Sequence, residues 1–127
     1  MRKHSLLYIG FGLVILLWAL NFIALAFYFY WTLGWYDYMM HFLGGLTIGV
    51  LIIWFFKLSG ERSWKLFLAS FVPLMLIGVG WEIWEYANSL TFSTEDYRID
   101  TVHDLLMDAV GAASAYWLTT SRTRELS

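Results

Sequence analysis

Residues 6–30 read LLYIGFGLVILLWALNFIALAFYFY, an apolar run without a charged side chain. A helix of about 20 apolar residues crosses the hydrocarbon core of a bilayer, so this run is long enough to span a membrane. The preceding MRKHS is basic, as in a secretory signal peptide, but the apolar part of a signal is usually only about 7–15 residues long. We therefore expect an uncleaved first transmembrane helix.

The rest of the chain continues this pattern. Of its 127 residues, 60% are hydrophobic and 14% are charged, against about 25% charged in soluble domains. Further apolar stretches cover about 36–56, 64–87 and, interrupted by two aspartates, 101–118. They are continuous rather than alternating, which favours helices over strands. The sequence predicts an all-α polytopic membrane protein with one domain, residues 1–127, of four antiparallel transmembrane helices.

The basic residues indicate the orientation in the membrane. Seven of the eight Lys and Arg residues lie before the first predicted helix, between the second and third, or after the fourth. The positive-inside rule assigns that side to the cytoplasm. Eight of the ten acidic residues lie at or near the other side, as an acidic rim that attracts cations. We expect both termini in the cytoplasm and the protein in the inner (plasma) membrane.

Composition also excludes several classes of function. The chain has no cysteine, which excludes disulfides, iron–sulfur clusters and thiolate zinc sites. Its basic residues are few and scattered, so nucleic-acid binding has no support. The sequence contains no phosphate-binding glycine loop, nucleophile elbow or HExxH motif.

Six ionisable residues stand inside the apolar stretches, in three pairs spaced by one helical turn. They are Asp37 with His41, Glu82 with Glu85, and Asp104 with Asp108. A charge at membrane depth costs about 2.5–3.5 kcal/mol on insertion scales, so a chain keeps it where it pairs, binds something or lines a wet cavity. Spacings of i,i+3 and i,i+4 place each pair on one helix face. We expect an outer tier of Asp37, Glu85 and Asp104 above a deeper tier of His41, Glu82 and Asp108.

Five carboxylates and one imidazole in a small apolar site require a counter-charge, because like charges oppose one another's ionisation. The leading interpretation is a divalent metal ion, since helical bundles hold metals with carboxylates and His at this spacing. Such ligands suit Mg, Mn or Ca and also allow Zn. Two alternatives stay open: a protonated network that ties three helices together, and a proton or cation pathway. The inner half offers little polarity beyond Asn21 and Thr47, which counts against a pathway through one chain.

The neighbourhood of the six residues supplies further candidates. Glycines at 44, 45, 49, 78, 80 and 111 fall within a few turns of them and would let the helices approach closely. Residues 88–100 form the only long predicted loop on the outer side and could act as a lid. His103 is a candidate general base, although a loop histidine without such a role is an equally simple interpretation.

The motifs occur in an order that resembles a known family. Tyr36-Asp37-x-x-x-His41-Phe42 is followed by Glu82-x-x-Glu85 and by Arg98…Asp104-Leu105-Leu106-x-Asp108-x-x-Gly111-Ala112. Over about Tyr36 to Tyr116 this resembles the VanZ-like family of small bacterial membrane proteins and the related YjdF-type inner-membrane proteins. The resemblance implies that these polar residues and Gly111 are the recurrent positions of the family.

Three residues depart from the VanZ-like pattern. Tyr38 stands where Lys is usual, Glu85 where Gln is usual, and Asp108 where Asn is usual. Each change makes the site more acidic, which is closer to the YjdF-type pattern and to cation binding. The family takes its name from glycopeptide (teicoplanin) resistance, so the resemblance implies cell-envelope chemistry without naming a reaction.

The sequence thus leads to one hypothesis and one competitor. In the first, the six residues bind a divalent metal and act on an envelope lipid or lipid-linked headgroup by hydrolysis or phosphoryl transfer. Arg98 would hold an anionic group and His103 would serve as acid or base. The competitor is a non-enzymatic metal- or proton-sensing subunit, or a small cation or proton transporter that works as an oligomer. A membrane lipid is the expected partner, and the sequence leaves open whether the chain forms a homo-oligomer.

Overall fold

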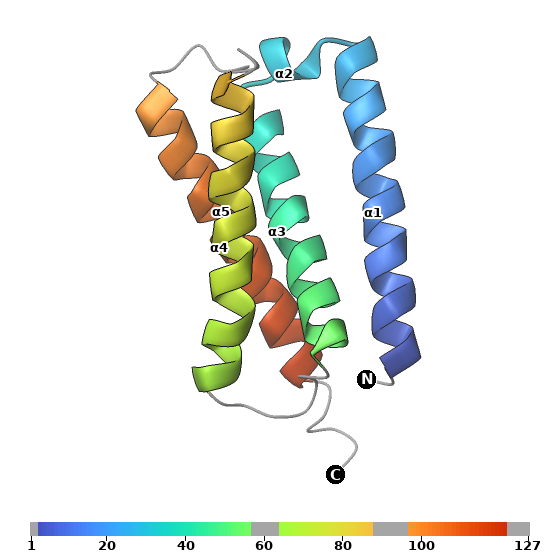
Figure 1. Cartoon of the computed structure of the whole chain (residues 1–127). Coiled ribbons are helices and arrows are strands. Elements are labelled where there is room, and N and C mark those ends of the chain that lie inside the picture. The colour runs from blue at the N-terminus through green and yellow to red at the C-terminus, as the bar shows by residue number, and fades with distance from the viewer. Residues whose placement is uncertain (1–2, 57–63, 88–96, 122–127) are drawn as a thin grey trace.

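The computed structural model describes residues 3–56, 64–87 and 97–121. The regular structure in these ranges is entirely helical, which confirms the all-α part of the predicted fold (Figure 1). The helices are α1 (Lys3–Ala26), α2 (Phe29–Thr32), α3 (Tyr36–Phe55), α4 (Trp64–Ala87) and α5 (Tyr97–Ser121).

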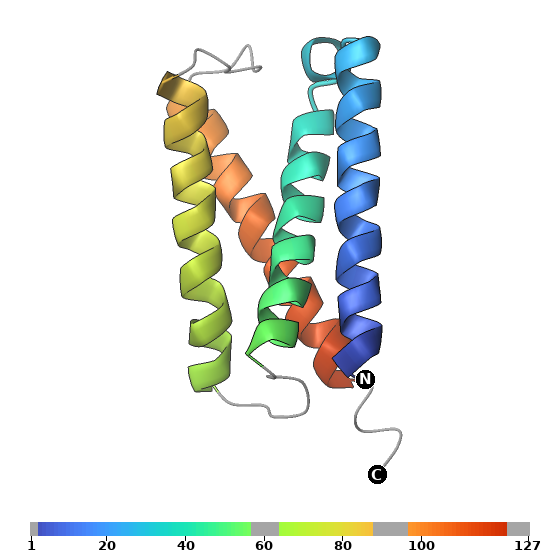
Figure 2. The same cartoon turned by 45° about the vertical axis from the view of Figure 1, so that its right-hand side comes forward.

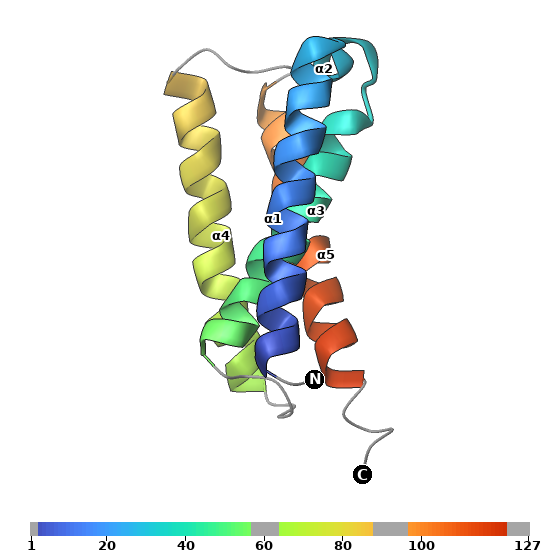
Figure 3. The ribbon, with the colours of Figure 1, turned by 90° about the vertical axis from the view of Figure 1, so that its right-hand side faces the viewer.

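The helix α3 lies at the centre of the molecule. It packs most extensively on α5 and also contacts α1 and α4, while α4 contacts α5. Successive long helices run in opposite directions, so that α1 begins and α5 ends at the same end of the molecule (Figure 1). Figure 2 shows α5 crossing behind the other helices at a slant, and Figure 3 shows α4 standing apart from α1.

Three of these helices are long and apolar enough to cross a membrane. They comprise His4–Ala26, Tyr36–Phe55 and Phe67–Ala87. Large apolar side chains cover their outer faces; Trp18 is 64% exposed and Leu76 70% exposed. Such a surface is unfavourable in water and suits contact with lipid. The helix α5 has 25 residues but is not among the three, because one arginine and three aspartates occupy its first half.

The first helix ends at Ala26, four residues before its predicted end near 30. Tyr28 adopts a left-handed conformation, with φ 59°, which interrupts the helix and starts the short α2. Two hydrogen bonds tie this turn to α1: the hydroxyl of Tyr30 donates to Asn21 Oδ1 (2.9 Å), and the hydroxyl of Tyr36 donates to the carbonyl oxygen of Leu20 (2.9 Å). The break therefore folds Tyr30 back toward the membrane-spanning helices.

The last helix begins at Tyr97, one turn before the predicted start at about 101. Arg98 and Asp100 consequently lie on α5 and not in a loop. The rest of the predicted lid, residues 88–96, lies outside the described residues. Bounds predicted at about 36–56 and 64–87 agree within one residue with those of α3 and α4.

Glycines allow α3 and α5 to cross in close contact. A Cβ atom on Gly45 would collide with the backbone carbonyl of Asp108, and one on Gly111 would collide with the backbone oxygen of Phe42. One turn further along α3, Gly49 faces Ala112 and Ala115. This approach brings the acidic residues of α5 against α3 without intervening side chains.

We predict that Gly111→Ala destabilises the protein by about 1–3 kcal/mol, the usual cost of overpacking a tight site. The added methyl group meets backbone atoms of α3, which cannot rotate away. Gly80→Ala is the matched control, because a Cβ at Gly80 meets nothing within 4 Å. Thermal unfolding in detergent would measure both, and equal melting temperatures for the two variants would contradict the close crossing.

Candidate metal centre

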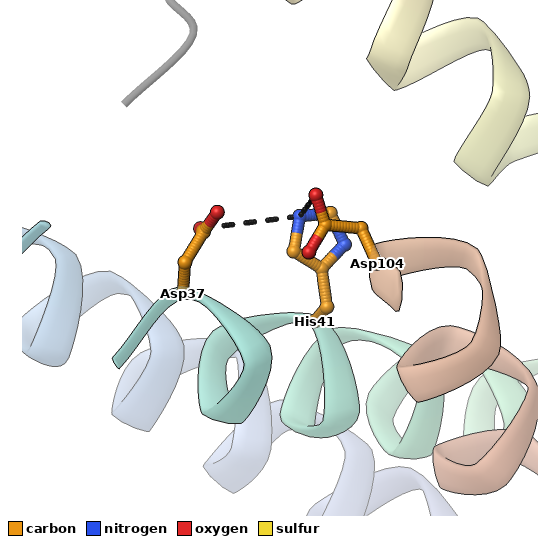
Figure 4. Close-up of side chains that lie close together, drawn as sticks. All are labelled: Asp37, His41 and Asp104. Atoms are coloured by element: carbon orange, nitrogen blue, oxygen red, sulfur yellow. Dashed lines mark ion pairs between the residues drawn. The ribbon is translucent and has the colours of Figure 1, made fainter. Parts of the chain in front are cut away.

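Three helices bring their ionisable residues together near one end of the molecule. The helix α3 contributes Asp37 and His41, α4 contributes Glu82 and Glu85, and α5 contributes Asp104 and Asp108. Figure 4 shows Asp37 and His41 projecting from α3, and Asp104 projecting from α5 toward them. The predicted pairs therefore converge as their helical spacing indicates.

The imidazole of His41 is the centre of this cluster. Its Nε2 atom lies 4.0 Å from Asp37 Oδ1, 3.9 Å from Glu82 Oε1 and 3.8 Å from Asp104 Oδ2. These separations are well beyond the usual range of about 2.7–3.2 Å for an N–H···O hydrogen bond. They are no longer than two metal–ligand bonds of about 2.0–2.2 Å placed end to end. A small cation among the four atoms could contact all of them after modest side-chain movement.

The other ring nitrogen of His41 has a different partner. Its Nδ1 atom lies 3.3 Å from Asp108 Oδ1. If Nδ1 carries the proton and donates it to this carboxylate, the lone pair of Nε2 faces Asp37, Glu82 and Asp104. Metal-binding histidines characteristically donate their second N–H to a carboxylate, which fixes the orientation and tautomer of the ring. The geometry thus separates the carboxylates around Nε2 from Asp108 behind the ring.

Two carboxylate oxygens in the cluster are buried without a hydrogen-bond partner in the described part of the chain. They are Glu82 Oε1 and Asp104 Oδ1, on residues that are 4% and 2% exposed. A buried neutral group without a hydrogen-bond partner lowers stability by about 1–3 kcal/mol, and a charged acceptor lowers it by more. A proton or a metal ion at the cluster would remove that cost.

Two α5 residues hold Glu82 in place. Thr101 Oγ1 donates to Glu82 Oε2 (3.0 Å), and the hydroxyl of Tyr97 donates to the backbone carbonyl of Glu82 (3.1 Å). Neither residue was among those predicted for the site, since the predicted last helix excluded Tyr97 and had Thr101 at its first position. Spacings of four, seven and eleven residues from Tyr97 reach Thr101, Asp104 and Asp108, a helical face that an earlier start would have revealed.

The carboxylates form two groups with metal-ligand spacing, and both include His41. One contains Asp37 and Asp104, the other contains Glu82 and Glu85, and within each group the ligand atoms lie within 4.8 Å of one another. These groups do not coincide with the two expected tiers, because each combines at least one residue of the outer tier with His41 of the deeper one. Either a single ion or a pair of ions is compatible with this arrangement.

Arg98 and His103 lie outside these groups. Both side chains are exposed on α5. His103 Nδ1 lies 3.4 Å from the Tyr38 hydroxyl, and the two rings meet edge to face at 5.5 Å. The predicted acid/base residue His103 thus contacts α3 at Tyr38, and neither His103 nor Arg98 belongs to the groups with metal-ligand spacing.

A pocket of about 380 Å³ adjoins the cluster, a size within the range of small-molecule sites. Asp37, His41, Glu85 and Asp108 line its polar part, together with Tyr30 and Asn21. Burial raises the pKa of the Tyr30 phenol above its ordinary value, and the nearby Asp37 raises it further. The phenol consequently keeps its proton and remains a donor to Asn21.

We predict that Thr101→Val lowers the free energy of unfolding by about 1–3 kcal/mol, because it leaves Glu82 Oε2 without its donor. Thr119→Val is the control: Thr119 is buried on α5, where Thr101 is half-buried, and its hydroxyl donates only to carbonyls of its own helix. Chemical or thermal unfolding in detergent would compare the variants. An equal loss of stability in both would show that Thr101 has no special role at Glu82.

No curated protein and no solved structure matches the chain. A family model described as predicted membrane protein (DUF2238) matches residues 2–125, nearly the whole chain. That description names neither the VanZ-like nor the YjdF-type family, so the resemblance to them stays a prediction. The family match and the apolar helices agree in one conclusion: the chain belongs to the DUF2238 family of predicted membrane proteins.

Proposed function

We propose that the protein binds a divalent metal ion at the cluster and acts on the headgroup of a membrane lipid. The proposal rests on the arrangement of carboxylates around the two ring nitrogens of His41. Three carboxylates approach Nε2 at 3.8–4.0 Å while a fourth lies at Nδ1. Two of the carboxylate oxygens are buried without a hydrogen-bond partner in the described ranges. Mg, Mn, Ca or Zn would be compatible with these ligands.

A metal explains the cluster better than a purely structural network does. In a structural network the buried oxygens would accept hydrogen bonds at ordinary distances. Here Thr101 satisfies one oxygen of Glu82, and the other faces His41 at 3.9 Å. Protonation of some carboxylates would reduce the charge but would not shorten these contacts. We therefore assign Asp37, His41, Glu82, Glu85 and Asp104 as candidate ligands, with Asp108 orienting the ring or joining them.

The protein would span the membrane four times, with both termini in the cytoplasm. The charged first half of α5 is the feature that argues against a fourth transmembrane helix. Its aspartates at 100, 104 and 108 are buried against the other helices, while apolar residues occupy the exposed face. These exposed residues are Ile99, Val102, Leu106, Val110 and Trp117. A helix that buries its aspartates and exposes mainly apolar side chains, with Arg98 and His103 exposed only in its first two turns, is compatible with a transmembrane position in the inner membrane, despite its lower hydropathy.

The favoured reaction class is hydrolysis or phosphoryl transfer at a lipid phosphate. A bound divalent metal would polarise a phosphoryl oxygen or activate water there. Arg98 would contact the anionic headgroup, and His103 would exchange a proton with the reacting oxygen. Both residues are exposed in the first two turns of α5, at the end that would face the outer surface, where a headgroup would lie.

The competing role as a transporter has less support. At the other end of the molecule Leu6, Val50, Ile53 and Ala115 form an apolar core. The hydroxyls of Thr47 and Thr119 donate to carbonyls of their own helices. The described core therefore offers no continuous row of polar groups from the cluster to that end. A sensing subunit that binds metal without catalysis remains the alternative, and it would bind metal but show no activity on lipids.

We predict near-stoichiometric divalent metal in the protein purified in detergent, measured by elemental analysis. His41→Ala and the double variant Asp37→Ala/Glu82→Ala should lose it. Asp108→Asn should bind it about 10–100-fold more weakly, as expected when a group that orients a ligand is changed. His103→Ala is the control and should retain the metal, because His103 belongs to neither ligand group. Absence of metal from the wild type, even after reloading, would leave a protonated network as the explanation.

The metal-loaded protein should also release inorganic phosphate from vesicles that contain a lipid phosphomonoester. Glu82→Gln should lose both metal and activity. His103→Ala should keep the metal and lower the rate by about 10²–10⁴-fold, the usual contribution of an acid/base group. Metal binding without phosphate release from such lipids would favour the sensing role.

A further inference from the structure

The pocket beside the cluster lies between two helices that do not touch. In the described part of the chain α1 and α4 each contact α3 but not one another. Figure 2 shows the two helices apart, with α3 between them in that view, and Figure 3 shows them apart in their upper parts. The pocket lies in this interval, since residues of α1, α3 and α4 line it.

The pocket has an apolar part and a polar end. Leu17 and Trp18 of α1 face Ile77 and Trp81 of α4 across it, and Ile48 of α3 contributes to its lining. The polar end contains His41 and the acidic residues of the cluster. Gly44 also lines the pocket, and a Cβ there would meet only Asp108 Oδ1, at 3.9 Å.

The medium around the pocket determines which kind of ligand can occupy its apolar part. Its lining residues belong to helices that are long and apolar enough to cross a membrane. At that depth the neighbouring medium is lipid hydrocarbon rather than water. From His41 to Ile48 the pocket follows α3 for seven residues, or about 10 Å at 1.5 Å per residue. This is about two thirds of one leaflet of a 30 Å hydrocarbon core.

We propose that this pocket seats one hydrocarbon chain of a membrane lipid, which enters sideways from the bilayer between α1 and α4. The phosphate headgroup of that lipid then lies at the cluster. The placement of the headgroup rests on the proposed metal site, while the seating of the chain rests on the pocket alone.

Asn21 is the residue that would recognise the headgroup from the α1 side. Its Oδ1 accepts the hydrogen bond from Tyr30, so the N–H groups of its amide are the donors that it can offer to a ligand. Asn21 lines the pocket together with His41 and Glu85. It adds a hydrogen-bond donor for phosphate oxygens to a site otherwise rich in acceptors.

The test is photo-crosslinking of the full chain in vesicles that contain phosphatidic acid with a diazirine on one acyl chain. Peptide mapping of the wild type should find label concentrated at the pocket residues Leu17, Trp18 and Ile77. Ile48→Trp should lose this label because the indole fills the apolar part. Ile15→Trp is the matched control and should keep it, since Ile15 is 60% exposed and does not line the pocket.

Label spread evenly over the lipid-facing residues, or unchanged in Ile48→Trp, would overturn the inference. Elemental analysis and thermal unfolding of the same Ile48→Trp sample would establish that the variant is folded. The metal measurement also separates this inference from the proposed function. Pocket label without metal in the wild type would support the chain site and contradict the metal site. Metal without pocket label would contradict the chain site alone.

Discussion

The contact between His41 and the carboxylates of three helices is the constraint on which the rest of the structure depends. Each acidic group at membrane depth costs several kilocalories per mole unless it is neutralised or bonded. Helices that carry such groups are therefore more stable when packed together than apart, provided that a cation or protons neutralise the carboxylates. The imidazole is only 10% exposed, so its partners must come from within the protein or its ligand. Binding and folding are coupled at such a site.

The close crossing of α3 and α5 makes this contact geometrically feasible. Aspartate side chains are short, and those of α5 reach His41 only because Gly45 and Gly111 let the two backbones touch. Thr101 and Tyr97 then fix Glu82 from the same helix. The helix α5 thus contributes two carboxylates of the cluster, Asp104 and Asp108, and also the groups that orient Glu82 of α4. Substitution of the glycines at the crossing, or of Thr101 and Tyr97, would therefore disturb the geometry of the cluster, although none of these residues is a candidate metal ligand.

The sequence predicted much of this, and its failures have physical reasons. The continuous apolar runs indicated the helices α3 and α4, and the spacing of the acidic residues indicated the faces that converge. It did not indicate the break at Tyr28, because a left-handed conformation of a non-glycine residue depends on tertiary contacts such as those of Tyr30 and Tyr36. The predicted start of α5 also came too late in the sequence, because a polar first turn resembles a loop until its partner helices are known. Which nitrogen of His41 faces which carboxylate depends on distances that no pattern contains.

The same reasoning explains why α5 differs in hydropathy from the other long helices. A transmembrane helix surrounded by lipid must be apolar on every face, whereas one packed against neighbours needs an apolar surface only where lipid touches it. Residues 99, 102, 106 and 110 of α5 are exposed and apolar, and residues 100, 104 and 108 are buried and acidic. Average hydropathy conceals this division because it sums over both faces. The acidic face therefore lowers the mean hydropathy of α5, so that composition alone does not identify this helix as a membrane span. The same face brings its carboxylates to His41.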